Sequence, residues 1–197
     1  MSYAIVLLAA GRGSRFQSIK QLAMLNEQLL VNRQLGFYCR FQRPLYLVLG
    51  AYQAQIEAQI EPKYLSDITI VSNPDWALGM GHSISQAMAY ITTHSNYSHA
   101  LIALLDQPCI TQADIELLMA QSHREPDSII SAGYAEQTGV PAIFPAQQFH
   151  ALQSLQGDVG AKKIIHKSHH KRIVDMPNAA FDIDTQQQLN EIRNSLC

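Results

Sequence analysis

The sequence is poor in cysteine and in long apolar runs, and each shortage excludes a class of protein. Its three cysteines, Cys39, Cys109 and Cys197, lie far apart, and no two of them have the spacing of a metal or redox site. Reduced thiols and a cytoplasmic location are therefore expected. No apolar run approaches the roughly 20 residues that cross a bilayer. The N-terminus leads straight into an apolar strand without a charged segment, so no secretory signal is expected.

Charge is also scarce. The 197 residues carry a formal net charge of −2, and only 15% of them are charged while 47% are hydrophobic. This balance argues against broad binding to nucleic acid or to an anionic membrane, because proteins that bind either usually carry a large excess of basic residues. The composition is that of a globular protein with a sizeable core. With no linker, repeat or low-complexity segment, we expect residues 1–197 to form a single domain.

Short apolar runs alternate with segments of helical periodicity. Several runs are apolar on both faces, which is typical of central strands in a parallel sheet covered by helices on both sides. The pattern predicts a doubly wound α/β sandwich. Strands are expected at 3–8, 45–49, 68–71, 100–105 and 128–132. Helices are expected at 29–40, 53–61, 81–92 and 112–123, the last capped by Thr111 with Asp114 in its first turn.

Beyond residue 133 the pattern loosens. The segment GYAEQTGVPAIFP is rich in turn residues. Helices are then expected at 146–155 and 159–166, followed by a short strand and a C-terminal helix from about Thr185.

A glycine loop follows the first strand and carries two cations. It lacks the spacing of a Walker loop, and Phe16 stands where a dinucleotide fingerprint needs its third glycine. Small residues nevertheless allow the backbone to approach a phosphate chain closely, and Arg15 and Lys20 can neutralise it. A plain strand-to-helix turn with two solvated cations is the alternative. The small residues are Ala9, Ala10, Gly11 and Gly13.

Five blocks in order carry a resemblance to a known family. LAAGRGSRFQSIKQL, NPDWALGMGHSI, LLDQPCITQADI, the pair GVPAIFP and GDVGAKKII, and FDIDTQQQL resemble the motifs of MobA-like NTP transferases, especially the molybdenum cofactor cytidylyltransferase branch. The resemblance implies a three-layer α/β/α sandwich with a mostly parallel, Rossmann-like sheet of the nucleotide-diphospho-sugar transferase type. It also implies nucleotide binding by Leu8, Ala9, Ala10, Gly11, Arg12, Gly13 and Lys20, with Arg15, Lys20 and Asp106 as catalytic residues.

Several positions depart from the family motifs. Gln17 and Asn26 stand where glycine is usual, and Gln28 stands where proline is usual. Lys162 or Lys163 occupies the position of an arginine, and Gln188 replaces a final acid. These departures leave the expected chemistry intact but weaken any inference about the substrate.

Carboxylates are the expected metal ligands. Asp106 follows an apolar run, at the edge of the sheet where ligands of open α/β folds bind, and its oxygens suit Mg²⁺. Its alternative role is that of a turn former or helix-start acid. The family position offers Asp182 and Asp184 as the second carboxylate, of which only one is expected to point inward. We favour Asp182, because Asp184 is also placed to cap the last helix.

By resemblance, Gly79, Met80 and Ser83 line the base and ribose pocket, with simple helix entry and packing as the alternatives. Trp76 is the sole tryptophan, and core packing is its default role. Acceptor binding is assigned to Gln107, Pro141 and Asp158, the last of which is equally suited to cap a helix.

The segment HKSHHKR places His166 and His170 four residues apart, on one face if the segment is helical. No nearby carboxylate or cysteine completes a ligand set, so a solvated basic surface is the preferred interpretation. A basic rim for an anionic acceptor is the minor alternative.

The resulting hypothesis is a magnesium-dependent nucleotidyltransferase. It would move a nucleoside monophosphate, by resemblance CMP from CTP, onto the terminal phosphate of molybdopterin or molybdenum cofactor, and a recipient molybdoenzyme or its chaperone would be a partner. Positioning and charge neutralisation suffice for such chemistry. The alternatives are transfer to a sugar phosphate or isoprenoid-precursor phosphate, and a non-catalytic nucleotide-binding protein that delivers cofactor.

Overall fold

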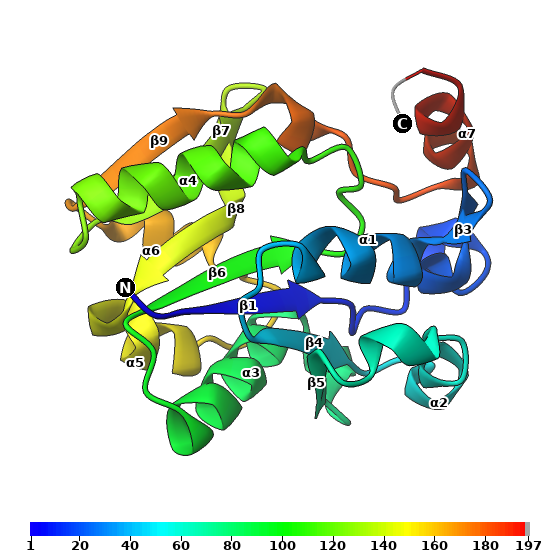
Figure 1. Ribbon diagram of the computed structural model, residues 1–197, viewed down its shortest axis with the longest axis horizontal. Helices are drawn as coiled ribbons and strands as arrows, with labels where there is room; N and C mark the ends of the chain where they lie inside the picture. Colours follow the sequence, from blue (N-terminus) through cyan, green and yellow to red (C-terminus); the bar gives the residue numbers. More distant parts are fainter. Residues whose placement is uncertain (196–197) are drawn as a thin grey trace.

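A mixed β-sheet forms the centre of the molecule, as a computed structural model of residues 1–195 shows (Figure 1). Within this range seven strands pair in the order β5-β4-β1-β6-β8-β7-β9, and β8 alone runs antiparallel to its neighbours. The strands are β1 (Tyr3–Leu8), β4 (Leu45–Leu49), β5 (Ile68–Ser72), β6 (His99–Leu104), β7 (Ile129–Tyr134), β8 (Gln137–Pro145) and β9 (Lys171–Asp175). A separate short hairpin joins β2 (Met24–Leu25) to β3 (Gln28–Leu29).

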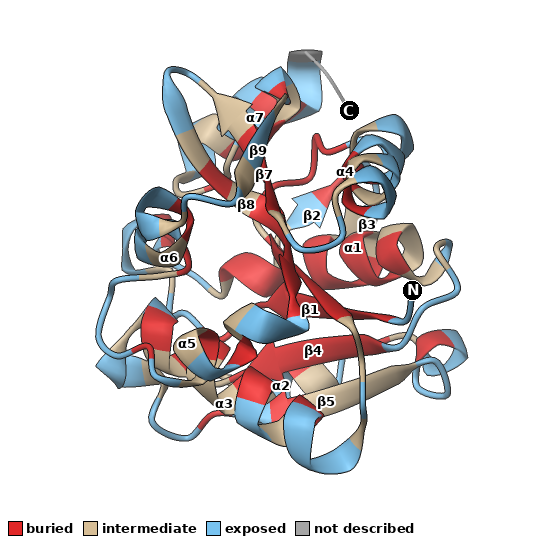
Figure 2. Ribbon diagram, turned by 90° about the vertical axis from the view of Figure 1, so that its left-hand side faces the viewer, coloured by how far each residue is buried: buried red, intermediate tan, exposed pale blue. Residues whose placement is uncertain are grey.

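Helices cover both faces of this sheet, which makes three layers (Figure 2). Strand β1 is buried along its whole length, and its side chains alternate between two apolar clusters. Tyr3, Ile5 and Leu7 pack on the side of α1 and α4, while the residues between them pack on the side of α3, α5 and α6. The helices are α1 (Leu30–Cys39), α2 (Gln53–Glu57), α3 (Met80–His94), α4 (Gln112–Arg124), α5 (Phe149–Gln153), α6 (Lys162–Lys167) and α7 (Gln186–Ser195).

The expected α/β sandwich is confirmed, and strands 3–8 and 45–49 have the expected bounds. Thr111 caps α4 through a reciprocal capping box with Asp114, as its position indicated. Four helices are shorter than expected: α1 loses one residue at each end, α2 ends at Glu57, α5 begins only at Phe149 after a 3-10 turn, and α6 begins at Lys162.

The loose pattern after residue 133 was misleading. The segment holds the end of β7 and all of β8, a hairpin whose second strand pairs with β6 from His99–Pro145 to Ile102–Ala142. Its tip is the two-residue turn of Ala135 and Glu136, both of which adopt positive φ, whereas Gly139 and Pro141 lie within β8. Cys197 lies outside the described residues, and within them no helix is long and apolar enough to cross a membrane.

Two departures from the family motifs occupy left-handed backbone positions. Gln17 has φ 64° and Asn26 has φ 49°, and glycine is the family's usual residue at both. Asn26 and Glu27, with φ 64°, form the two-residue turn between β2 and β3. The backbone thus keeps a conformation that suits glycine, although the side chains differ.

Replacing Gln17 with glycine is expected to stabilise the protein. A side chain in this conformation costs about 1–2 kcal/mol, and the greater freedom of glycine in the unfolded chain takes back part of the gain. Gln17→Gly should therefore raise the free energy of unfolding by up to about 1 kcal/mol, measured by urea denaturation. Asn26→Gly is the matched comparison and should gain less, because asparagine tolerates positive φ. A loss of stability in Gln17→Gly would contradict this explanation.

Candidate active site

The glycine loop and Asp106 emerge at the same edge of the sheet because they follow neighbouring parallel strands. Strands β1 and β6 pair in register up to Leu8 and Leu104, and the backbone N–H of Leu105 donates to the carbonyl of Leu8 at 3.1 Å. A cavity of about 320 Å³ opens between these strand ends. It is lined by Leu8, Ala9, Ala10, Gly11, Gly13, Ser14, Arg15, Lys20, Gln21, Trp76, Gly79, Met80, Ser83, Leu104, Leu105, Asp106 and Asp184.

The carbonyls of Ala9, Ala10 and Gly11 are hydrogen-bonded within the protein, whereas the amides of residues 10–13 have no partner among the described residues. The carbonyl of Ala10 accepts the N–H of Ala51 at 2.9 Å. Among residues 1–195, no partner accepts a hydrogen bond from the backbone amides of residues 10–13. A Cβ at Gly11 would meet nothing within 4 Å, so the space in front of the loop is open. Successive unbonded amides in an open concavity form an anion-binding surface.

Gln21 fixes the shape of this loop, which the sequence alone did not indicate. Its side-chain amide nitrogen donates to the carbonyls of Ala9 at 2.7 Å and Gly11 at 2.9 Å, and the residue is 2% exposed. Because both partners are acceptors, only the nitrogen end of the amide can face them. The side chain thus engages two loop carbonyls, and the loop amides stay available to a ligand.

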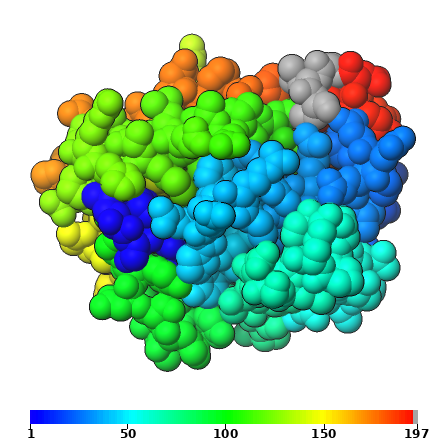
Figure 3. Space-filling view, in the orientation of Figure 1, coloured from blue at the N-terminus to red at the C-terminus, as the bar shows by residue number. Residues whose placement is uncertain are grey.

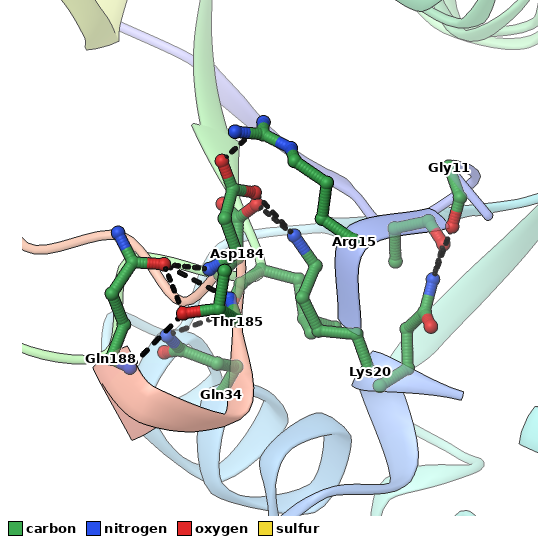
Figure 4. A network of polar contacts seen from close by, with 11 residues as sticks. Gly11, Arg15, Lys20, Gln34, Asp184, Thr185 and Gln188 are labelled. Atoms are coloured by element: carbon green, nitrogen blue, oxygen red, sulfur yellow. Dashed lines mark hydrogen bonds and ion pairs between the residues drawn. The ribbon is translucent and has the colours of Figure 1, made fainter. Parts of the chain in front are cut away.

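Four charged side chains from three distant segments meet in the cavity wall (Figure 4). The Lys20 ammonium lies 2.6 Å from Asp106 Oδ2 and 3.3 Å from Asp184 Oδ1, and Arg15 contacts Asp184 Oδ2 at 2.6 Å. Lys20 is largely buried, whereas the Arg15 side chain is 74% exposed and free to reorient. Burial works to lower the pKa of Lys20, but the two carboxylates outweigh it and raise that pKa, so the ammonium stays charged.

Asp184, rather than Asp182, lies in the cavity wall, and this corrects the preference drawn from the sequence. The N–H of Ile183 donates to the carbonyl of Asp106 at 2.8 Å, which holds this segment against the strand end. Asp182 and Asp184 are two residues apart, and such residues share a side of an extended segment. The two carboxylates can therefore lie near each other even though only Asp184 lines the cavity, and burial together with the charges of Asp184 and Asp106 raises the pKa of Asp182.

The alternative role of Asp184 as a helix cap is filled by other residues. The N–H of Gln188 donates to Thr185 Oγ1 at 3.2 Å, while Gln188 Oε1 accepts the N–H groups of Asp184 and Thr185 at 2.9 Å. This reciprocal arrangement caps α7 with Thr185. Gln188, which replaces the usual acid, thereby acquires a structural role, and the Asp184 carboxylate is left for Arg15 and Lys20.

The two cavity carboxylates fit a hard cation in combination with a ligand. Asp106 Oδ1 is buried and has no hydrogen-bond partner among the described residues. Such an oxygen costs free energy unless a ligand, water or cation interacts with it. Within residues 1–195, no group of three or more His, Cys, Asp or Glu side chains is placed to hold a metal ion. A cation here would thus be held by Asp106, Asp184 and oxygens supplied from elsewhere, as Mg²⁺ is beside substrate phosphates.

The opposite wall of the cavity comes from the start of α3. Gly79 has φ 101°, and a Cβ there would lie 2.5 Å from Asp158 Oδ1 and from the Gly157 backbone, so glycine is required. Buried Asn73 donates through Nδ2 to Ser83 Oγ at 2.9 Å, which orients that hydroxyl. Half-buried Trp76 packs against the core cluster on the side of α3, as expected, and also contributes to the wall.

Some residues proposed from the sequence lie outside the cavity lining. Arg12 is exposed and donates to the Tyr52 hydroxyl at 3.3 Å. Gln107 is buried and donates to the carbonyls of Ala179 and Val140, and Pro141 is buried in β8. Asp158 is exposed beside Gly79, at the edge of the cavity.

The histidine pair behaves as a basic surface segment. Helix α6 ends at Lys167, so His166 and His170 do not share a helix face. His166 lies within hydrogen-bond distance of the Thr138 hydroxyl, at 3.4 Å.

Comparison with known proteins agrees with this geometry. Residues 5–173 match the model of the MobA-like NTP transferase domain. The chain belongs to this family. Its members are NTP transferases, and the cavity of this chain carries the glycine loop and the first acid of the motifs that gave the resemblance.

Individual relatives support the same assignment at a distance. The bifunctional protein GlmU of Bifidobacterium adolescentis is 31% identical over 120 residues, covering 59% of this nucleotidyltransferase and 26% of GlmU. The chain thus spans less than a third of the length of this curated relative. A homologue of Rv0371c from Mycobacterium sp. strain JC1 is 26% identical with a TM-score of 0.82, covering 98% of this chain and 96% of that one. Rv0371c of Mycobacterium tuberculosis H37Rv, in complex with manganese, is 24% identical with a TM-score of 0.77, covering 100% of both chains.

Asp182→Asn is expected to stabilise the metal-free nucleotidyltransferase at neutral pH. Because the folded-state pKa of Asp182 is raised, the native state holds this proton more tightly than the unfolded state does. Ionisation therefore costs stability as the pH rises through the folded pKa, and the asparagine variant avoids that cost. Its melting temperature should exceed that of the wild type at pH 7, and the difference should vanish near pH 3. Asp127→Asn, at an exposed position, is the control. An advantage that persists at low pH would refute the electrostatic cause.

Proposed function

We propose that this nucleotidyltransferase moves a nucleoside monophosphate from its triphosphate, most favourably CMP from CTP, onto the terminal phosphate of molybdopterin or molybdenum cofactor. One observation carries the proposal: a loop whose amides have no partner among the described residues, the cations Arg15 and Lys20, and the carboxylates of Asp106 and Asp184 all border a single cavity. Such a site presents groups for a polyphosphate on one side and for a divalent cation on the other.

The chemistry is a substitution at phosphorus. A terminal phosphate oxygen of the acceptor attacks the α-phosphorus, a new P–O bond forms, and the bond to the bridging oxygen breaks so that pyrophosphate leaves. The loop amides and Arg15 hold the phosphates and compensate the charge that moves onto the leaving group. A divalent cation, when bound, supplies charge neutralisation between the carboxylates and the phosphates. The acceptor phosphate is already an anion, so no general base is required.

Lys20 is suited to change partners during this cycle. In the ligand-free protein it neutralises Asp106 and Asp184, and its buried stem keeps the ammonium at the mouth of the loop. A cation on the two carboxylates would replace Lys20 there and free it for the triphosphate. The exchange keeps every charge compensated, and it avoids leaving an unpaired charge in a buried site.

The choice of CTP and of a molybdopterin acceptor rests on sequence resemblance. The run Leu8-Ala9-Ala10-Gly11 resembles the cytidylyl branch, whereas the guanylyl branch usually carries glycine as the third residue. The acceptor would enter beside Gly79 and Asp158, at the edge of the cavity. Transfer to another phosphorylated small molecule is the alternative, and comparing the rate of pyrophosphate release with different acceptors distinguishes the two.

Asp106→Asn should abolish most turnover while sparing the fold. The change removes the charge that faces Lys20 and, in the proposed complex, the cation. We expect the rate of pyrophosphate release with CTP, a divalent ion and acceptor to fall by roughly 100-fold or more, in a coupled phosphatase assay.

Glu125→Gln is the matched control for this substitution. It removes one carboxylate of an ion pair, the 2.6 Å contact with Arg172, outside the cavity lining. Its pyrophosphate release should be unchanged. If Asp106→Asn keeps wild-type turnover, the assigned site is wrong. If neither wild type nor control releases pyrophosphate but both bind nucleotide, the protein is a sensor or delivery protein.

A nucleotide panel tests the expected preference. CTP with Mg²⁺ or Mn²⁺ should raise the melting temperature more than GTP, ATP or UTP, because a ligand that binds only the native state stabilises it. Lys20→Gln should remove most of the nucleotide-induced rise in melting temperature, because this variant has no ammonium group at the loop. Equal shifts for all four nucleotides would contradict a base-specific pocket.

A further inference from the structure

A second cavity of about 400 Å³ lies between α1 and the loop that follows Asp106, apart from the nucleotide cavity. Its volume falls in the range of small-molecule sites. Its wall is mostly polar and is formed by Gln28, Arg33, Gln34, Gly36, Phe37, Arg40, Tyr64, Pro108 and Ile110. Helix α1 lies on the face of the molecule seen in Figure 3, and Arg40 at the end of this helix is exposed.

Two guanidinium groups in this wall have no anionic partner among the described residues. Within residues 1–195, neither Arg33 nor Arg40 makes an ion pair, whereas Arg15 and Arg172 both do. Arg33 lies on α1 and Arg40 is the residue that ends it, still in helical conformation, so the two lie on one side of the helix, two turns and about 10 Å apart along its axis. Guanidinium groups bind phosphate oxygens in a forked geometry, so the pair can hold two anionic groups at separate points.

The acid Glu61 lies beside this cavity, and the protein already neutralises it. Gln28 Nε2 donates to Glu61 Oε1 at 3.3 Å, while Lys63 contacts Glu61 Oε2 at 2.6 Å. The Lys63 ammonium also lies 4.9 Å from the centre of the Tyr64 ring. Glu61 is therefore paired with Lys63 rather than with an arginine of the cavity wall.

We infer that this second cavity binds a small molecule with phosphate groups at two separated positions. The two arginines would hold the phosphates, and the amides of Gln28 and Gln34 with the Tyr64 hydroxyl offer hydrogen bonds to polar groups between them. This inference does not depend on the nucleotide or acceptor proposed above, because it concerns a different cavity.

The test is a residue-resolved NMR titration of the metal-free protein. Fructose 1,6-bisphosphate serves as the probe, and fructose 6-phosphate, with one phosphate, serves as the comparison. Saturable amide shifts are expected at Phe37, Tyr64 and Ile110. Arg33→Gln combined with Arg40→Gln should weaken the apparent affinity at these amides by roughly tenfold or more, and the monophosphate should bind more weakly than the bisphosphate.

Matched variants separate a built site from general charge. Arg43→Gln combined with Arg124→Gln removes the same charge from two exposed arginines outside the cavity and should leave the affinity unchanged. Arg33→Lys combined with Arg40→Lys keeps the charge but loses the forks, and should bind between the wild type and the glutamine pair. Shifts confined to the glycine loop and Lys20, equal loss in the control pair, or no saturation at roughly 10 mM probe would each overturn the inference.

Discussion

The contact of Lys20 with two carboxylates is the interaction that holds the candidate site together. It joins the end of the glycine loop to Asp106 after β6 and to Asp184 before α7, segments that are distant in the sequence. Burying the Lys20 ammonium without partners would cost free energy, and so would burying the Asp106 carboxylate without a partner. Each charge therefore fixes the others in place, and the cavity has its electrostatic form before any ligand binds.

Much of the fold was predictable because its strands are buried on both faces. β1 and β4 are continuous apolar runs, and nothing in them competes with the strand assignment. The β7–β8 hairpin was missed for the opposite reason. Its glycine, proline and polar residues read locally as a loop, while the pairing of β8 with β6 that makes it a strand comes from residues about 40 positions away.

The candidate site was predictable where the chemistry resides in a short motif, and not where it depends on long-range hydrogen bonds. The glycine loop, Arg15, Lys20 and Asp106 follow from local patterns and strand ends. Gln21 gave no signal, because a single glutamine reveals its function only when its amide is seen against the loop carbonyls. The role of Asp184 likewise required the Thr185–Gln188 cap to be visible.

The segment after β6 connects the two cavities physically. Asp106 faces Lys20, while Pro108 and Ile110, a few residues further on, line the second cavity. Gln34, in the wall of that cavity, donates through Nε2 to the carbonyl of Leu105 at 3.1 Å, directly before Asp106. A ligand that draws α1 toward itself would therefore act on the backbone that positions the carboxylate. Any such coupling is reciprocal, so occupation of the nucleotide cavity would alter the affinity of the second one by the same factor.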